Sequence, residues 1–124
     1  MILITGSTGQ LGASVAQQLL DRTEKRQFAV FARDAAKAAH YKARGIRLRI
    51  GDFDDPSSLP VAFAGVSKLL LISSRSMNRA EQQRRVVDEA VNAGVKHIIY
   101  TSLAVQDINN SHIQNLMESH FDTE

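Results

Sequence analysis

The chain has 124 residues, of which 44% are hydrophobic, and its formal net charge is +2 at pH 7. This length predicts one domain, and the lack of cysteine excludes disulfides, thiolate metal sites and a cysteine nucleophile. The apolar runs are far shorter than the ~20 residues that span a bilayer, and no aromatic residues interleave the basic ones as on nucleic-acid-binding surfaces. We therefore expect a cytoplasmic protein that binds neither nucleic acid nor membrane, and the sequence gives no sign of a metal or a flavin.

Strand-like segments alternate with segments of helical periodicity along the whole chain. The predicted strands cover residues 1–5, 28–32, 47–51, 68–73 and 97–101. Continuous apolar runs such as residues 69–72 suit strands that are buried on both faces of a parallel sheet. The alternation predicts an α/β fold in three layers, with a doubly wound parallel sheet at its centre.

The first three helices are expected between the first four strands. The first helix carries an apolar stripe made of Leu11, Val15, Leu19 and Leu20. The second helix is expected to begin at Asp34, as its cap, and to run to about Gly45. The third is short and falls within residues 57–64, where Pro60 leaves its start open.

The last two helices are marked by clearer end signals. The fourth is expected over residues 78–93, with Gly94 as the glycine that ends it. The residues expected to face the core from this helix are Ala80, Val87, Ala90 and Val91. The fifth begins near Ser111, which forms a capping box with Gln114. Its apolar stripe consists of Ile113, Leu116, Met117 and Phe121.

Three glycines separate the first strand from the first helix, in the run Thr5-Gly6-Ser7-Thr8-Gly9-Gln10-Leu11-Gly12. Gly6 permits a tight turn, Gly9 lets backbone approach a pyrophosphate, and Gly12 lets the helix pack closely on the sheet. The helix N-terminus attracts the diphosphate, and Ser7, Thr8 and Gln10 can add side-chain donors. A turn without a ligand is the alternative, but the strand–loop–helix context favours a dinucleotide. A P-loop is excluded, because no Gly-Lys-Ser/Thr follows.

The residue after the second strand indicates which of the two nicotinamide cofactors, NAD or NADP, is bound. Acidic side chains at this place bind the ribose hydroxyls of NAD, whereas an arginine suits the 2′-phosphate of NADP. Here Arg33 occupies the place, and we favour NADP over NAD; a surface arginine with no ligand is the alternative. Asp34 can serve a ribose hydroxyl, although we expect it to cap the second helix.

Residues after the third and fourth strands extend the predicted cofactor site. Asp52 is placed to accept from the adenine amino group or, equally, to cap its own turn, and Phe53 can flank the adenine ring. Ile72, Ser73 and Ser74 would line the cofactor beside its diphosphate and nicotinamide ribose. Ser74 can equally cap a loop.

Several motifs together resemble one family over nearly the whole chain. The segments "TGSTGQLG", "ARDAAKA", "GDFDD", "KLLLISS", "AGVKHIIYTSL" and "HFDTE" resemble the NmrA-like branch of the atypical short-chain dehydrogenases. Within that branch the resemblance is greatest to bacterial NADPH:quinone oxidoreductases. It implies a Rossmann fold that binds NADPH through residues 6–11, Arg33 and residues 72–74.

The resemblance also shows where catalytic groups are to be sought. His120 and Glu124 stand where typical members carry a Tyr-x-x-x-Lys pair, and Ser102 matches the catalytic serine. Ser102 and His120 are therefore our candidates, although His120 can equally be an ordinary helix residue. A quinone would suit a site without the tyrosine, because its product anion is phenolate-like, with a pKa near ~10. A simple ketone gives an alkoxide about 6 units more basic, a difference of roughly 8 kcal/mol.

The family continues beyond the part that this sequence matches, with further strands and a C-terminal substrate lobe. We therefore expect residues 1–124 to form an incomplete NAD(P)-binding domain of marginal stability. Residues 97–102 would leave an apolar sheet edge, which makes a homo-oligomer possible. The leading functional hypothesis is hydride transfer from NADPH to a quinone or a similar small electrophile. The alternatives are a non-catalytic NAD(P) sensor and an inactive fragment.

Overall fold

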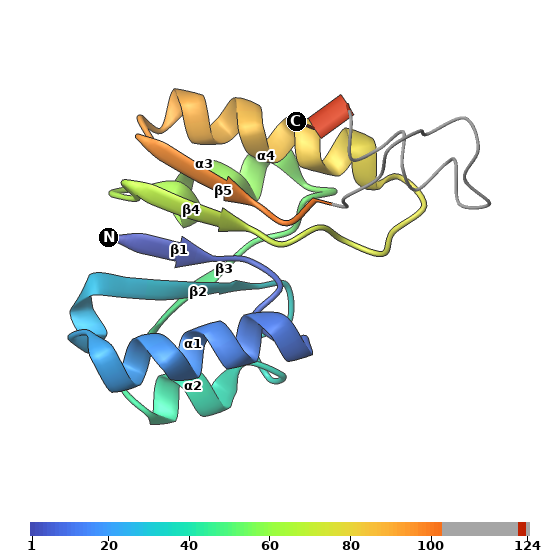
Figure 1. Ribbon diagram of the computed structural model, residues 1–124. Helices are drawn as coiled ribbons and strands as arrows, with labels where there is room; N and C mark the ends of the chain where they lie inside the picture. The colour runs from blue at the N-terminus through green and yellow to red at the C-terminus, as the bar shows by residue number, and fades with distance from the viewer. Residues whose placement is uncertain (103–121, 124) are drawn as a thin grey trace.

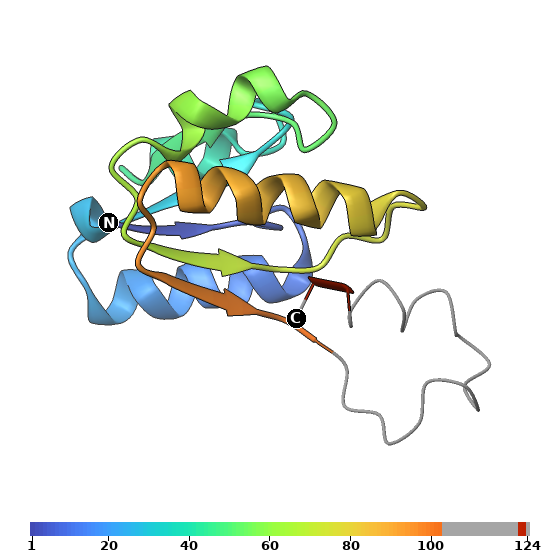
Figure 2. The ribbon, with the colours of Figure 1, turned by 90° about the horizontal axis from the view of Figure 1, so that it is seen from above.

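One parallel sheet of five strands organises the chain in the computed structural model, which describes residues 1–102 and 122–123. The strands are β1 (Ile2–Ile4), β2 (Phe28–Ala32), β3 (Arg47–Ile50), β4 (Lys68–Leu71) and β5 (His97–Tyr100). Their spatial order is β3-β2-β1-β4-β5, and every neighbouring pair is parallel. Figure 2 shows β1, β4 and β5 side by side and pointing the same way. The predicted doubly wound sheet is confirmed.

Helices cover both faces of this sheet and complete the three layers (Figure 1). The helices α1 (Gln10–Arg22) and α2 (Ala39–Ala43) pack on one face, where Phe28, Val30 and Tyr41 are buried. The other face is covered by α3 (Leu59–Phe63) and α4 (Arg79–Asn92), around Phe31, Phe63 and Leu69. Two short 3₁₀ turns, Lys25–Gln27 and Pro56–Ser58, precede β2 and α3.

The order of the strands creates a switch point between β1 and β4. The chain builds outward from β1 through β2 to β3, then returns to build β4 and β5 on the other side. Ligands of such sheets bind at the carboxyl ends of the strands at this point. The buried Thr5 side chain ties the two strand ends together, because its Oγ1 donates to the Leu70 carbonyl (3.1 Å) and accepts from the Ile72 N–H (2.9 Å).

The glycine loop after β1 is held by a contact between backbones. Gly6 adopts φ +61°, which favours glycine, and the Gly9 N–H closes the turn on the Gly6 carbonyl at 3.0 Å. A Cβ at Gly12 would lie 2.2 Å from the Gly6 oxygen and 2.6 Å from the Gly6 carbonyl carbon. The close approach predicted at Gly12 is therefore between α1 and the loop, rather than between α1 and the sheet itself.

The second helix begins later than the sequence indicates. We expected it from Asp34, but α2 starts at Ala39, and turns occupy residues 35–38. The Asp34 carboxylate accepts from the N–H groups of Ala36 (2.8 Å) and Lys37 (3.3 Å). This local cap stabilises a turn, and alanine propensity alone does not convert the turn into helix.

The fourth helix ends as predicted, and of its predicted core residues Ala90 is fully buried and Val87 packs partly buried against the core. Gly94 takes φ +77°, and the Val95 N–H bonds the Ala90 carbonyl at 2.9 Å, as expected of a helix end. Val91, predicted to face the core, is 69% exposed, whereas Gln83 is fully buried. A prediction that relies on apolar residues misses part of the buried face of α4, because that face includes two glutamines, Gln82 and Gln83.

Two further predictions concern apolar side chains at the ends of the sheet and helices. Leu11 was assigned to the core stripe of the first helix but is 51% exposed, since it lies in the first turn, beside the glycine loop. Within the described residues β5 pairs only with β4, and Ile98 and Ile99 are 38% and 56% exposed. The expected apolar edge is present there.

The fifth helix, with Ser111, Gln114 and the stripe Ile113, Leu116, Met117 and Phe121, lies outside the described residues.

Replacing Gly12 by alanine tests the backbone contact. Alanine normally stabilises a helix interior relative to glycine by ~1 kcal/mol. At Gly12 we expect Gly12→Ala instead to lower the free energy of unfolding by ~1–3 kcal/mol, because the Gly6 carbonyl must move. Urea denaturation measures this value. Gly9→Ala is the control and should change it by less than about 1 kcal/mol, since its Cβ would lie 3.4 Å from the nearest atom. Equal stability of Gly12→Ala and the parent would contradict the assignment.

Candidate functional site

The N-terminus of α1 forms one side of a hollow at the switch point. Gly9 is the N-cap and provides no capping side chain, and the first turn contains no acidic residue. The first N–H groups of a helix lack partners within the helix and attract anions. The hollow is lined by Thr8, Gly9, Gln10, Leu11 and, across from the loop, Ser73 and Arg75. This side of the site fits a diphosphate, with the backbone as its main donor.

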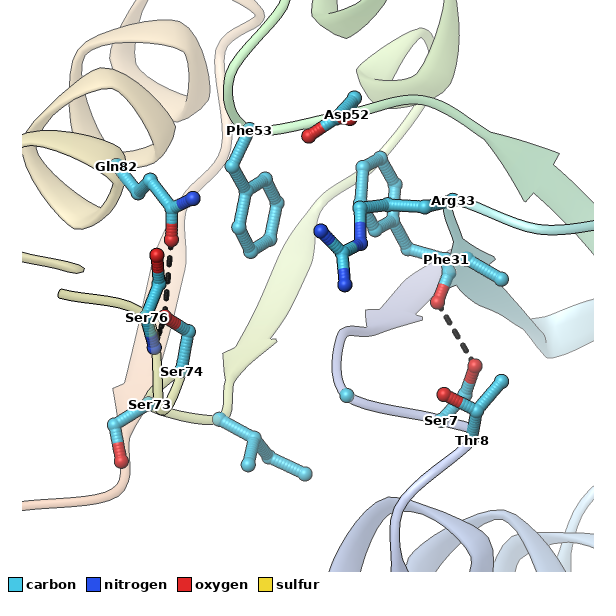
Figure 3. A pocket seen from close by; sticks show the side chains of 13 residues that line it. Ser7, Thr8, Phe31, Arg33, Asp52, Phe53, Ser73, Ser74, Ser76 and Gln82 are labelled. Carbon is cyan, nitrogen blue, oxygen red and sulfur yellow. Dashed lines mark hydrogen bonds between the residues drawn. The ribbon is translucent and has the colours of Figure 1, made fainter. Parts of the chain in front are cut away.

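The Ser7 side chain is not one of those donors, contrary to the sequence prediction. Ser7 is 1% exposed, and its Oγ donates to the Phe31 carbonyl at 2.8 Å (Figure 3). The hydroxyl therefore ties the glycine loop to the end of β2. Thr8 and Gln10 are exposed, as a direct role for their side chains requires.

A second hollow adjoins the first and is walled by two aromatic rings. Phe53 stacks on Phe31 with ring centroids 4.9 Å apart and planes inclined by 11°. Both line the hollow, together with Ile72, Ser73 and Ser74 from the end of β4 (Figure 3). A flat, apolar wall with polar groups at its rim suits a nucleoside base. Phe53, expected at the adenine ring, and residues 72–74, expected beside the diphosphate and nicotinamide ribose, therefore line the same hollow.

Arg33 brings positive charge to this second hollow. Its guanidinium reaches over the space between Phe53 and the glycine loop (Figure 3). Among the ion pairs of the described residues, none involves Arg33. The neighbouring Asp34 carboxylate is occupied by its own turn. The guanidinium is consequently available to an anionic group of a ligand.

Asp52 and Ser74 both line the hollow and cap their own loops. Asp52 Oδ1 accepts from the Asp54 N–H at 2.9 Å, which leaves the carboxylate further acceptor capacity. Ser74 Oγ accepts from the Ser76 N–H at 3.1 Å and donates to Gln82 Oε1 at 2.9 Å. For Asp52 and Ser74 alike, the sequence left two alternatives: lining the cofactor site or capping a loop. The structure shows that one residue can do both.

Sequence reasoning missed several residues of the site, among them Phe31, Gln82, Ser76 and Arg75. Gln82, 3% exposed, bridges Ser74 and Asp54 from the first turn of α4, with its Nε2 donating to Asp54 Oδ2 at 2.8 Å. Ser76 also lines the second hollow, and Arg75 lines the first. A glutamine near a helix start resembles a solvent-facing residue, so no signal identified it. The position of Arg75 two residues past the predicted strand could have identified it.

The catalytic candidates are only partly within the described structure. Ser102 follows β5 and is exposed. Its neighbour Thr101 accepts from the Ser73 N–H at 2.9 Å, which joins the ends of β5 and β4. His120 and Glu124 lie outside the described residues. In the part of the chain that is described, no three acidic or histidine side chains group as a metal site requires, and no helix is long and apolar enough to cross a membrane.

A buried phenol supports the glycine loop from α2. Tyr41 is 2% exposed, and its hydroxyl donates to the Ser7 carbonyl at 2.5 Å. Burial raises the pKa of the Tyr41 phenol above its ordinary value of 10.0, and the nearby positive charge of Arg44 partly opposes this rise. The phenol therefore stays protonated, and able to donate, across the physiological pH range.

Comparison with known proteins gives the site a context. The profile of the NmrA-like family matches residues 1–124. Quinone oxidoreductase 2 of Escherichia coli (strain K12) is 43% identical over 125 residues, which cover 100% of this chain and 43% of that protein. The chain thus spans less than half the length of this relative.

Two solved structures are similar over nearly the whole chain. Citrobacter sp. triphenylmethane reductase complexed with NADP(H) superimposes with a TM-score of 0.91 and 41% identity, over 99% of this chain and 43% of that one. The NADPH-dependent quinone oxidoreductase QOR2 from Escherichia coli, complexed with NADPH, gives a TM-score of 0.88 and 43% identity, with 99% and 43% coverage. The fold of this chain is therefore that of a nucleotide-binding domain.

The raised pKa of Tyr41 predicts a pH dependence of stability. Above pH ~10 the unfolded chain loses the phenol proton while the folded chain keeps it, so the free energy of unfolding falls as pH rises through the folded pKa. The slope from this one group is at most about 1.4 kcal/mol per pH unit. We expect Tyr41→Phe to lack this part of the slope in denaturation measured from pH 8 to 11. Identical slopes in the two proteins would contradict the assignment.

Proposed function

The chain belongs to the NmrA-like family, and we propose that it binds NADPH as the dinucleotide-binding domain of an oxidoreductase that reduces quinones or similar small electrophiles. The observation that carries the proposal is the pair of adjoining hollows at the switch point between β1 and β4. One offers helix N–H groups to a diphosphate, and the other offers an aromatic wall and an arginine to an adenosine 2′-phosphate.

The residues of the site fit a dinucleotide in three respects. The open face of Gly9 lets a phosphate approach the backbone, since a Cβ there would meet no protein atom closer than 3.4 Å. Phe53 and Asp52 supply a flat surface and an acceptor for adenine. Ile72, Ser73 and Ser74 continue the wall toward the end of β4. The cofactor contacts that we propose are residues 6–12, 33, 52–53 and 72–74, with the Ser7 contact made by its backbone.

Arg33 supports NADPH rather than NADH as the cofactor. A guanidinium can form two charge-assisted hydrogen bonds with a phosphate. NADH carries a ribose hydroxyl at this place, and the Asp34 carboxylate that would suit it caps its own turn. The structures of quinone oxidoreductase 2 with NADPH and of triphenylmethane reductase with NADP(H) support the same choice.

The proposed reaction is the transfer of a hydride to a small acceptor, and bound NADPH would supply the hydride. The acceptor is one whose reduced anion is weakly basic, so the enzyme needs no strong general acid. A quinone meets this condition because its product is phenolate-like, with a pKa near ~10. The similarity to quinone oxidoreductase 2 supports this substrate class. We propose that substrate contacts lie in the part of the relatives that this chain does not match. Ser102 and His120 are the candidates at the nicotinamide end. We also expect a cytoplasmic location.

The preference for NADPH can be tested at Arg33. We expect calorimetric titration to give tighter binding of NADPH than of NADH by tenfold or more, and Arg33→Ala to weaken NADPH binding ten- to a hundredfold. This range corresponds to the ~1.5–3 kcal/mol of a charge-assisted hydrogen bond. NADH binding should change by less than about twofold. Arg22→Ala, an exposed arginine at the far end of α1, is the control and should leave both affinities unchanged. No binding of either cofactor would refute the proposal.

The substrate class can be tested by turnover. The NADPH oxidation rate should rise on addition of a simple benzoquinone and should not rise with a saturated ketone of similar size. A difference of roughly 8 kcal/mol in the basicity of the product anions underlies this expectation. Comparable rates with ketone and quinone would contradict the proposed chemistry. NADPH binding without turnover of either would favour the two alternatives, a nucleotide sensor or an inactive fragment.

A further inference from the structure

One buried side chain contacts the glycine loop from outside the site. Tyr41 reaches from α2 to the carbonyl oxygen of Ser7, and both residues are at most 2% exposed. The Ser7 hydroxyl, on the same residue, holds the Phe31 carbonyl at 2.8 Å. Ser7 is thus fixed through its side chain to β2 and through its carbonyl to α2. This double attachment sets the orientation of the peptide that follows.

That peptide is the Ser7–Thr8 bond. The described residues contain no cis peptide bond, and in a trans peptide the carbonyl and the N–H point in opposite directions. Because Tyr41 holds the Ser7 carbonyl, the Thr8 N–H points to the opposite side of the loop. Within the described residues no oxygen accepts a hydrogen bond from this N–H. Thr8 lines both hollows and therefore stands where they meet.

We propose that Tyr41 is a positioning residue for the diphosphate: its hydroxyl fixes the Ser7–Thr8 peptide so that the Thr8 N–H donates to a phosphate of the bound dinucleotide. The inference rests on the proposed function and deepens it. Tyr41 touches no ligand itself. Its effect is confined to the diphosphate, because Arg33 reads the 2′-phosphate from the end of β2 and needs no help from this peptide.

Two ligands that carry different phosphates separate these roles. ADP-ribose contains the diphosphate but no 2′-phosphate, and adenosine 2′-monophosphate contains the 2′-phosphate but no diphosphate. Tyr41→Phe keeps the ring and removes the hydroxyl. We expect it to weaken ADP-ribose binding about tenfold, as loss of one well-aimed donor to a phosphate predicts. Binding of adenosine 2′-monophosphate should change by less than about twofold, whereas Arg33→Ala should show the reverse pattern.

Tyr100→Phe is the matched control. It makes the same chemical change at a phenol on β5, which accepts from Gln83 Nε2 at 3.1 Å and lines neither hollow. This variant should bind both ligands as the parent does. If Tyr41→Phe weakened both ligands equally, the role would be structural, and the proposal would be overturned. Unchanged ADP-ribose binding in Tyr41→Phe would also overturn it while leaving the proposed function intact.

A second measurement needs no variant and covers the case in which Tyr41→Phe does not fold. The Thr8 amide proton of the parent chain, followed by nuclear magnetic resonance, should shift downfield by more than its Ala13 counterpart when ADP-ribose is added. Ala13 is a fair reference because its N–H already bonds the Gly9 carbonyl at 3.0 Å. An unmoved Thr8 amide at saturating ADP-ribose would refute the positioning role. Failure of the parent to bind either ligand would refute the proposed function, and this inference with it.

Discussion

The contact between Gly6 and Gly12 is the constraint on which the site depends. A Cβ at Gly12 would stand 2.2 Å from the Gly6 oxygen, so α1 can begin this close to β1 only because the side chain is absent. The closeness places the first N–H groups of α1 directly beyond the strand end. It also fixes where the loop must pass, between the carboxyl ends of β1 and β4. The position of the proposed diphosphate site follows from this packing.

Hydroxyl side chains hold the strand ends around that loop. Backbone groups at the ends of parallel strands lose their regular partners, and buried ones need a substitute. Thr5 supplies it between β1 and β4, Ser7 between the loop and β2, and Thr101 between β5 and β4. Each hydroxyl is attached directly to Cβ, so it reaches the backbone of the neighbouring strand without a long, flexible side chain. These bonds tie the loop to the strand ends on the side where the diphosphate is proposed to lie.

This use of polar groups separates residues that build the site from those that face a ligand. Ser7 is a candidate ligand donor in the sequence, yet its hydroxyl bonds the Phe31 carbonyl. Asp34, expected as a cap, engages its carboxylate with backbone N–H groups. The donors that remain include Arg33, the N–H groups of the loop, Arg75 and the exposed side chains of Thr8 and Gln10. Specificity for a nucleotide with an extra phosphate can therefore rest on very few groups, because the others are held in place by bonds within the protein.

The doubly wound sheet, the glycine loop, and the placing of Arg33, Phe53 and residues 72–74 at the carboxyl ends of the strands could all be predicted from the sequence. These follow from local patterns, because parallel strands joined by helices always bring their carboxyl ends together. Three features could be seen only in the folded chain: Gln82 lines the second hollow, Gln83 rather than Val91 is buried, and Tyr41 bonds Ser7 across 34 positions. These features depend on contacts between residues far apart in the chain. The local sequence pattern around a residue does not show which distant side chain will pack against it.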